Sequence, residues 1–169
     1  MLSGESANGK FPVESIETMR TIINSAESVA GAEFHVSSGA DLAAAPTTPY
    51  EATAAAAVAA ANHGNASAIV TVSKTGETAR LVAKYRPNVP VVAVCLSAKV
   101  ARQLSLTRGV HPVVMTDVPT SEMFSQALSA AKAMGCCEVG DEVVVLSSEE
   151  GELSGLTHTV PTMRVAYIE

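Results

Sequence analysis

The chain has 169 residues, of which 47% are hydrophobic and 17% are charged, and this composition excludes a disordered chain. Its length suits one domain with a buried core better than two. The formal net charge of -6 disfavours nucleic-acid binding, which needs a concentrated positive face. We find neither a membrane-spanning apolar stretch nor a secretory signal, and we expect a cytoplasmic protein.

The N-terminal part of the sequence predicts one helix followed by a break. Met1–Gly9 is short, small and polar, which indicates the end of a strand running into a loop. From Val13 to Gly31 apolar residues recur at the spacing of one helical face. Residues 32–49 contain two prolines, two serines, two threonines and a glycine, which is typical of a linker. We therefore expect a boundary there, followed by an α/β domain at 50–169.

Beyond this linker, short apolar runs alternate with helical patterns. Runs of about five apolar residues are typical of buried parallel strands, and polar or proline-containing turns separate them from the helices. The predicted helices are 50–62, 78–85, 98–107 and one that starts near Thr120, and the predicted strands are 68–72, 91–95, 113–115, 142–146 and 163–168.

The order of these elements predicts the fold class. Strands joined through helices imply right-handed crossovers and a parallel sheet. The last connection differs, because no helix separates the strand at 142–146 from the strand at 163–168, so the last strand is expected to be antiparallel at or near an edge. The predicted fold is α/β, with an open three-layer, mostly parallel sheet of about five strands.

The strongest candidate binding segment follows the strand at 68–72. Its residues are Ser73, Lys74, Thr75, Gly76 and Thr78. Hydroxyl groups, a lysine and the N–H groups of a helix N-terminus suit a phosphate, and ligands of open α/β sheets bind at the carboxyl ends of strands. Spacing alone favours a simpler interpretation, in which Thr75 caps the helix and Gly76 makes the turn. The segment lacks the glycine and lysine spacing of a Walker loop.

Two other polar segments are weaker candidates. Ser147–Pro161 is predicted to be a long loop whose glycines and hydroxyls could surround an anion. Its carboxylates at Glu149, Glu150 and Glu152 would repel that anion, so a solvated connection is the favoured interpretation. Ser3–Lys10 matches no general nucleotide-binding motif.

The histidines and cysteines predict no metal site. The four histidines fall in turn or loop contexts without ligand spacing, and the adjacent Cys136 and Cys137 have no further ligand nearby. Cys95 lies in an apolar run and is expected to be buried. An odd number of cysteines fits a reducing compartment. For this chain itself we expect no metal and no cofactor.

Several segments, in this order, resemble pyruvate kinase. They are Met1–Glu14, Ser73–Ala79, Tyr85–Pro87, Arg108–Val113, Gly140–Val144 and Thr162–Val165. The first contains Met-Leu-Ser-Gly-Glu-Ser-Ala and is similar to the final strand and last helix of the family's (β/α) barrel, so 1–31 is identified as a remnant of that barrel. The remainder resembles the C-terminal domain that follows the barrel. The resemblance therefore covers essentially the whole chain.

The resemblance implies a role in regulation and assembly. The intact enzyme transfers a phosphoryl group from phosphoenolpyruvate to ADP, with magnesium and usually potassium. Its substrate-binding arginine, metal carboxylates and catalytic lysine lie in earlier barrel strands, whose segments this sequence lacks. We therefore expect the chain to be catalytically silent by itself and assign no catalytic residue. The family's C-terminal domain makes subunit contacts, which implies a homo-oligomer with other pyruvate kinase subunits.

The resemblance also implies a sugar phosphate site. Its effector-phosphate loop corresponds to Ser73, Lys74, Thr75, Gly76 and Thr78. The sequence departs from activated relatives at Glu149–Glu152, where those relatives often place basic or aromatic residues, and Glu77 adds a further negative charge. A sugar bisphosphate is therefore disfavoured relative to a monophosphate or no effector. A free-standing phosphate-ligand-binding module and a purely structural interaction module remain the alternatives.

The predicted helix within 1–31 poses a packing problem. Outside a barrel its apolar face, which includes Val13, Ile16, Met19 and Ile23, is exposed unless it repacks. We expect this helix to swap, dimerise or fray.

Overall fold

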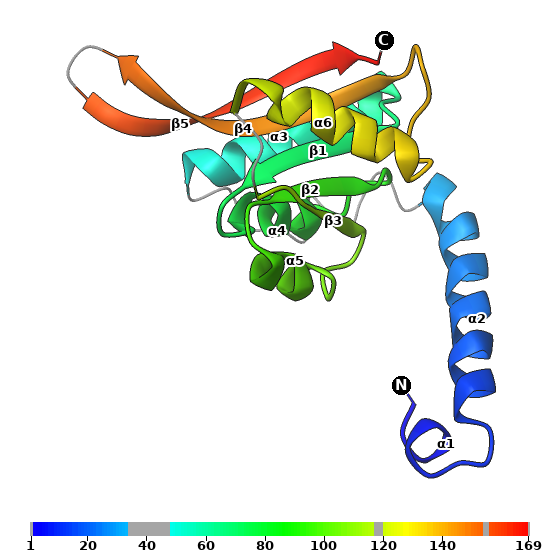
Figure 1. Ribbon diagram of the computed structural model, residues 1–169. Helices are drawn as coiled ribbons and strands as arrows, with labels where there is room; N and C mark the ends of the chain where they lie inside the picture. The colour runs from blue at the N-terminus through cyan, green and yellow to red at the C-terminus, as the bar shows by residue number, and fades with distance from the viewer. Residues whose placement is uncertain (1, 34–47, 117–119, 154–155, 169) are drawn as a thin grey trace. The chain divides into compact units, whose positions relative to one another are not determined.

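The computed structural model describes residues 2–33, 48–116, 120–153 and 156–168 (Figure 1). The chain forms two compact units, Met1–Ser38 and Gly39–Glu169. The predicted linker at 32–49 lies mostly outside the described residues and stays a prediction.

The N-terminal unit contains helices α1 (Gly4–Ala7) and α2 (Pro12–Glu33). Pro12 occupies the first position of α2, where a helix needs no N–H donor, and this helix is confirmed. The strand end predicted within Met1–Gly9 is wrong, because the Ala7 N–H donates to the Ser3 carbonyl at 2.9 Å and closes a helical turn. A helical turn satisfies its own backbone groups, whereas a strand needs a neighbouring strand.

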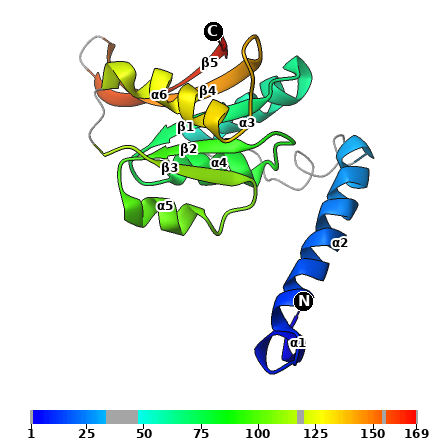
Figure 2. The ribbon, with the colours of Figure 1, turned by 45° about the vertical axis from the view of Figure 1, so that its right-hand side comes forward.

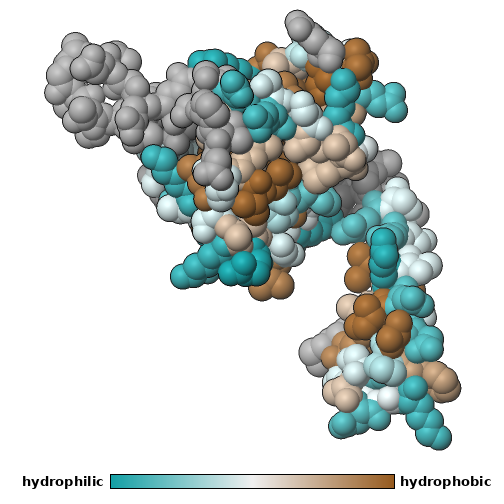
Figure 3. Space-filling model, in the orientation of Figure 1, coloured by the Kyte–Doolittle hydropathy of each residue, from teal (hydrophilic) through white to brown (hydrophobic). Residues whose placement is uncertain are grey.

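Helix α2 has the apolar stripe that its periodicity predicts. Val13, Ile16 and Ile23 are exposed, and Met19 is half-buried. Figure 3 shows apolar side chains gathered along this helix. A continuous apolar stripe normally packs against another helix or sheet. The exposed stripe of α2 is therefore typical of a packing surface.

The second unit is built on a five-stranded sheet (Figures 1 and 2). Its strands are β1 (Ala68–Ser73), β2 (Val91–Cys95), β3 (Val110–Val114), β4 (Glu142–Leu153) and β5 (Leu156–Tyr167). Their order across the sheet is β3-β2-β1-β4-β5. All neighbouring pairs are parallel except β4 and β5, which are antiparallel. The predicted fold class is confirmed, including the antiparallel last strand at an edge.

Four helices cover the two faces of this sheet. They are α3 (Pro49–Gly64), α4 (Glu77–Lys84), α5 (Ala98–Leu104) and α6 (Thr120–Ala133). The first three pack on one face and α6 packs on the other. Helix α3 begins where the Thr48 side chain accepts the Glu51 N–H at 3.2 Å, and it ends at Asn65 in a left-handed conformation.

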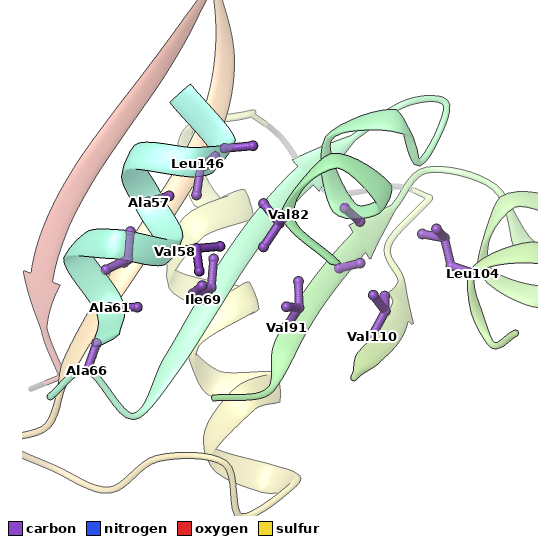
Figure 4. Close-up of a cluster of buried hydrophobic side chains, with 14 of the residues drawn as sticks. Ala57, Val58, Ala61, Ala66, Ile69, Val82, Val91, Leu104, Val110 and Leu146 are labelled. Carbon is purple, nitrogen blue, oxygen red and sulfur yellow. The ribbon is translucent and has the colours of Figure 1, made fainter. Parts of the chain in front are cut away.

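The core consists of one apolar layer on each side of the sheet. Side chains along β1 alternate between them: Ile69 joins the layer under α3, α4 and α5, and Val70 joins the layer under α6. Figure 4 shows the first layer, where Val82 of α4 and Leu104 of α5 point toward the same sheet. Alanines on α3, such as Ala57, bring that helix close to the strands.

Strands β4 and β5 continue well beyond their predicted ends. Their antiparallel register runs from Glu142 opposite Tyr167 to Leu153 opposite Leu156. The predicted loop Ser147–Pro161 is therefore wrong, because nearly all of its residues belong to a hairpin. The segment has few apolar residues and gives no strand pattern, whereas strand pairing depends on backbone groups.

Candidate functional site

The turn between β1 and α4 lies at the point where the order of the sheet reverses. The chain proceeds from β1 to β2 on one side, and β4 later returns to the other side of β1. Ser73 is the last residue of β1 and is paired in register with Cys95, so the turn lies at the carboxyl edge of the sheet. This is the usual position of a ligand site in an open α/β sheet.

Gly76 fixes the conformation of this turn. It is buried at the N-cap of α4, with a φ of 80° that favours glycine. A Cβ at this position would lie 3.0 Å from Val100 Cγ1 and 3.2 Å from both Leu104 δ-carbons. The turn therefore needs glycine both for its backbone conformation and for its close packing against α5.

The side chains on either side of Gly76 hold the turn more loosely. The Thr75 hydroxyl accepts the Glu77 N–H at 3.4 Å, as the capping interpretation predicts, although Gly76 occupies the N-cap itself. The Arg80 guanidinium donates to the Thr75 carbonyl at 3.5 Å. Both contacts are longer than typical hydrogen bonds, so these groups are easily reoriented by a ligand.

The predicted site residues come together around the first turn of α4. Lys74 and Thr75 are exposed, Thr78 is half-buried, and of Ser73 only the backbone is described. The N–H groups of a first helical turn lack acceptors within the helix, and the helix dipole there favours negative charge. The arrangement can bind an anion from solvent.

Arg80 is a site residue that the sequence prediction omitted. It stands four residues after Gly76, and its backbone N–H donates to the Gly76 carbonyl at 3.1 Å. Residues at this spacing lie on the same side of a helix, which is a signal that the sequence contains. With Lys74 it adds a second positive charge against the single carboxylate of Glu77.

The histidines, cysteines and carboxylates of the described residues form no metal-binding cluster. Nowhere in those residues do three His, Cys, Asp or Glu side chains lie together in a way that could hold a metal ion. Burial raises the pKa of the Cys95, Cys136 and Cys137 thiols, which lowers their reactivity. Within the same ranges, every helix is too short or too polar to cross a membrane.

Comparison with known families identifies the second unit. Residues 51–165 match the family described as "Pyruvate kinase, alpha/beta domain". This chain belongs to the pyruvate kinase family. The match includes all of the turn from Ser73 to Thr78, all of β4 and all but the last two residues of β5.

Individual pyruvate kinases match the N-terminal unit as well. The chain is 38% identical over 159 residues to pyruvate kinase of Clostridium acetobutylicum, covering 94% of this chain and 33% of the relative. It is 36% identical over 166 residues to pyruvate kinase of Eimeria tenella, and this match covers 98% of this chain and 31% of the relative. A solved structure of Cryptosporidium parvum pyruvate kinase in complex with ADP superposes on this chain with a TM-score of 0.78 at 32% sequence identity. The superposition covers 100% of this chain and 33% of the solved one. The chain thus spans about a third of the length of these pyruvate kinases.

Proposed function

We propose that this chain is the C-terminal regulatory and oligomerisation part of a cytoplasmic pyruvate kinase, and that its β1–α4 turn binds the phosphate of a sugar phosphate effector. The observation that carries the binding proposal is the buried, left-handed Gly76 at the sheet's switch point. The complete enzyme converts phosphoenolpyruvate and ADP to pyruvate and ATP with magnesium and potassium. These 169 residues by themselves are catalytically silent.

Catalytic silence follows from the chemistry of phosphoryl transfer. Such transfer depends on metal ions and cationic side chains that position and neutralise the phosphates. The described residues offer no cluster for a metal ion. An assay that couples pyruvate formation to NADH oxidation, supplied with phosphoenolpyruvate, ADP, magnesium and potassium, should give the rate of a buffer blank. Turnover above that blank, proportional to protein concentration, contradicts the proposal.

The phosphate proposal rests on the groups that converge at the turn. Lys74 and Arg80 supply positive charge, Thr75 and Thr78 supply hydroxyl groups, and the first turn of α4 supplies backbone N–H donors. Gly76 lets the backbone turn without a side chain between these groups and a ligand.

The effector is a monophosphate rather than a bisphosphate. Strand β4 is paired with β1 only as far as Leu146, which lies opposite Thr71. Past Leu146 it is paired only with β5, and this part of the hairpin contains Glu149, Glu150 and Glu152. The sequence thus gives this hairpin three carboxylates, and we expect their negative charge to oppose a second phosphate. We therefore expect a sugar bisphosphate to bind no more tightly than the corresponding monophosphate.

Thermal shift measurements with inorganic phosphate, a hexose monophosphate and a hexose bisphosphate test the site. The monophosphate should raise the melting temperature, and Lys74→Met should weaken its binding by about tenfold, the loss of one charge-assisted contact. Lys10→Met, which removes an exposed lysine from the N-terminal unit, should leave binding unchanged. Absence of any shift at millimolar ligand, or equal effects of the two variants, contradicts the phosphate proposal.

The oligomerisation proposal rests on β5. This edge strand has apolar side chains exposed at Met163, Val165 and Tyr167. They alternate along the strand and are paired opposite Leu146, Val144 and Glu142, so they lie on the face of the sheet that α3 covers. An exposed apolar row at the open edge of a sheet favours a subunit contact.

Sedimentation of the chain tests this contact. The parent chain should form a concentration-dependent oligomer, and Val165→Asp should shift it toward monomer because it places a charge in the contact. Val139→Asp, at another exposed apolar residue, is the matched control. An oligomer unchanged by Val165→Asp contradicts this location. Phosphate binding by a strict monomer would favour the free-standing module.

A further inference from the structure

Positive charge is concentrated in one segment of this acidic chain. Residues 74–108 contain seven of the eleven Lys and Arg residues but one of the seventeen Asp and Glu residues. This segment therefore has a formal charge of +6, and the rest of the chain has -12, which together give the net charge of -6. The net charge of the whole chain therefore does not show that its positive and negative residues are concentrated in different segments.

The fold places much of this charge on one surface. Helices α4 and α5 pack side by side on the same face of the sheet (Figures 2 and 4). Their inward sides are apolar, with Ala79 and Val82 on α4 and Ala101 and Leu104 on α5. Their basic side chains project from the opposite, solvent-facing side.

We refer to this outer surface as the basic face. It consists of Arg80 and Lys84 on α4 and Lys99 and Arg102 on α5, flanked by Arg86 and Arg108. All six side chains are exposed. Only Glu77 opposes them in the segment, and Lys84 is also paired with Glu51. The exposed positive charges of Arg86, Lys99 and Arg102 can attract an anionic partner.

We propose that the basic face is a docking surface for an acidic segment of a partner polypeptide. Leu106 lies beside it in sequence, between Arg102 and Arg108, and its side chain is 92% exposed. An almost fully exposed leucine that lies between two arginines in the sequence adds an apolar group next to positive charge, and this combination suits a peptide. This face shares Arg80 with the phosphate site, but Lys99, Arg102 and Leu106 lie outside the Ser73–Thr78 turn, so the docking proposal can be tested separately.

Its size and surroundings favour a polypeptide over a nucleic acid. Helix α4 has eight residues and α5 has seven, so each is only about 10–12 Å long. A nucleic acid would extend past this face onto the rest of the second unit, where residues 39–73 and 109–169 contain two Lys or Arg against eleven Asp or Glu and have a formal charge of -9. The one aromatic residue in the segment, Tyr85, packs against the apolar core rather than forming a stacking platform.

Fluorescence anisotropy with a labelled glutamate-rich peptide that carries one central leucine tests the proposal. The full chain should bind it at low ionic strength, bind it more weakly at physiological ionic strength, and not bind the same peptide with lysine in place of glutamate. The double variant Lys99→Gln/Arg102→Gln should weaken binding by about tenfold, as expected for two exposed ion pairs. Leu106→Ser should weaken it severalfold.

The matched control is Lys10→Gln/Arg20→Gln, which removes the same charge from α2 and the residues before it. It should bind the peptide like the parent. The Lys99→Gln/Arg102→Gln variant should keep its melting temperature and its response to inorganic phosphate. Failure of the parent to bind at low ionic strength overturns the proposal, as does equal weakening by the control. Tighter binding of a single-stranded oligonucleotide through the same residues also overturns it.

Discussion

Lys84 of α4 forms an ion pair with Glu51 of α3, and the two side chains differ sharply in exposure, at 44% and 6%. The Tyr85 hydroxyl also donates to the Glu51 carboxylate at 3.4 Å. The hydrogen bond to Glu51 is the main reason that the pKa of Lys84 lies above its ordinary value. A lysine with a raised pKa stabilises the fold below its unfolded-state pKa, and this contribution is lost only as the pH rises through the native pKa.

The unequal exposure predicts unequal effects of the two single substitutions. Lys84→Met leaves a carboxylate buried without its cation, whereas Glu51→Gln leaves an ammonium group that water solvates. We expect Lys84→Met to lower the urea midpoint more than Glu51→Gln, and the double variant to lose less than the sum of both. Lys99→Met, at an exposed lysine of α5, should leave the midpoint unchanged. Equal losses from both single variants would contradict this account.

Asp141 connects the starts of β1 and β4. Its Oδ2 accepts the Glu138 N–H and the Ser67 hydroxyl, both at 2.8 Å. These bonds, the first more than the second, lower the pKa of Asp141. A lowered carboxyl pKa stabilises the fold above the unfolded-state pKa of about 3.9, and this stability is lost as the pH falls through the native pKa.

Asp141→Asn should therefore lower the melting temperature by a constant amount at neutral and mildly acidic pH. Below a pH of about 4 the difference from the parent should shrink, because the unfolded-state aspartate takes up a proton first and the native aspartate follows only as the pH falls through its lowered pKa. Thermal melts across this pH range measure the difference. Glu138→Gln removes a neighbouring exposed carboxylate but keeps the Glu138 N–H, and it should show no such convergence. A difference that stays constant at acid pH would exclude ionisation as the cause.

The central strands were predictable because burial on both faces produces continuous apolar runs. Strand β2 matches its predicted bounds, Val91–Cys95. The edge strands were less predictable. Strand β3 was expected at 113–115 but runs from Val110 to Val114 and includes Pro112. The Met115 N–H donates to the Cys95 carbonyl, so by alternation Pro112 faces away from β2, where its missing N–H costs no hydrogen bond.

The candidate site was predictable in location but not in its supporting contacts. Residue types and a strand followed by a helix were enough to select the turn from Ser73 to Thr78. The packing of Val100 and Leu104 behind Gly76 depends on the approach of α5, which sequence spacing does not encode. The basic face was missed for a similar reason. Its residues alternate with apolar ones along the chain, and only the two helices bring Arg80 and Lys99 to one surface.

The buried hydroxyl of Thr71 marks a position where a substitution should stabilise the protein. It is fully buried in β1, and among the described residues its hydroxyl has no hydrogen-bond partner. Thr71→Val keeps the shape and removes the desolvated hydroxyl, so we expect stability to rise by about 1 kcal/mol. Thr71→Ser keeps the hydroxyl and loses a methyl group, and should be destabilising by about 1 kcal/mol. Urea titrations of the parent, Thr71→Val and Thr71→Ser measure these changes. A urea midpoint for Thr71→Val below that of the parent would mean that the Thr71 hydroxyl forms a stabilising hydrogen bond, and would contradict the prediction.

Alanine substitutions at Gly76 and Gly109 distinguish the cost of backbone strain from the cost of steric contact. Both have positive φ angles, 80° and 71°, but a Cβ at Gly109 has nothing within 4 Å, whereas one at Gly76 meets Val100 and Leu104. Gly109→Ala should cost only the left-handed strain of about 1–2 kcal/mol. Gly76→Ala should cost this and a further roughly 1–3 kcal/mol for overpacking against α5, and it should weaken phosphate binding because the turn must move. Urea unfolding and phosphate-dependent thermal shifts measure both effects. If the two variants lose equal stability, the contact with α5 does not constrain the turn.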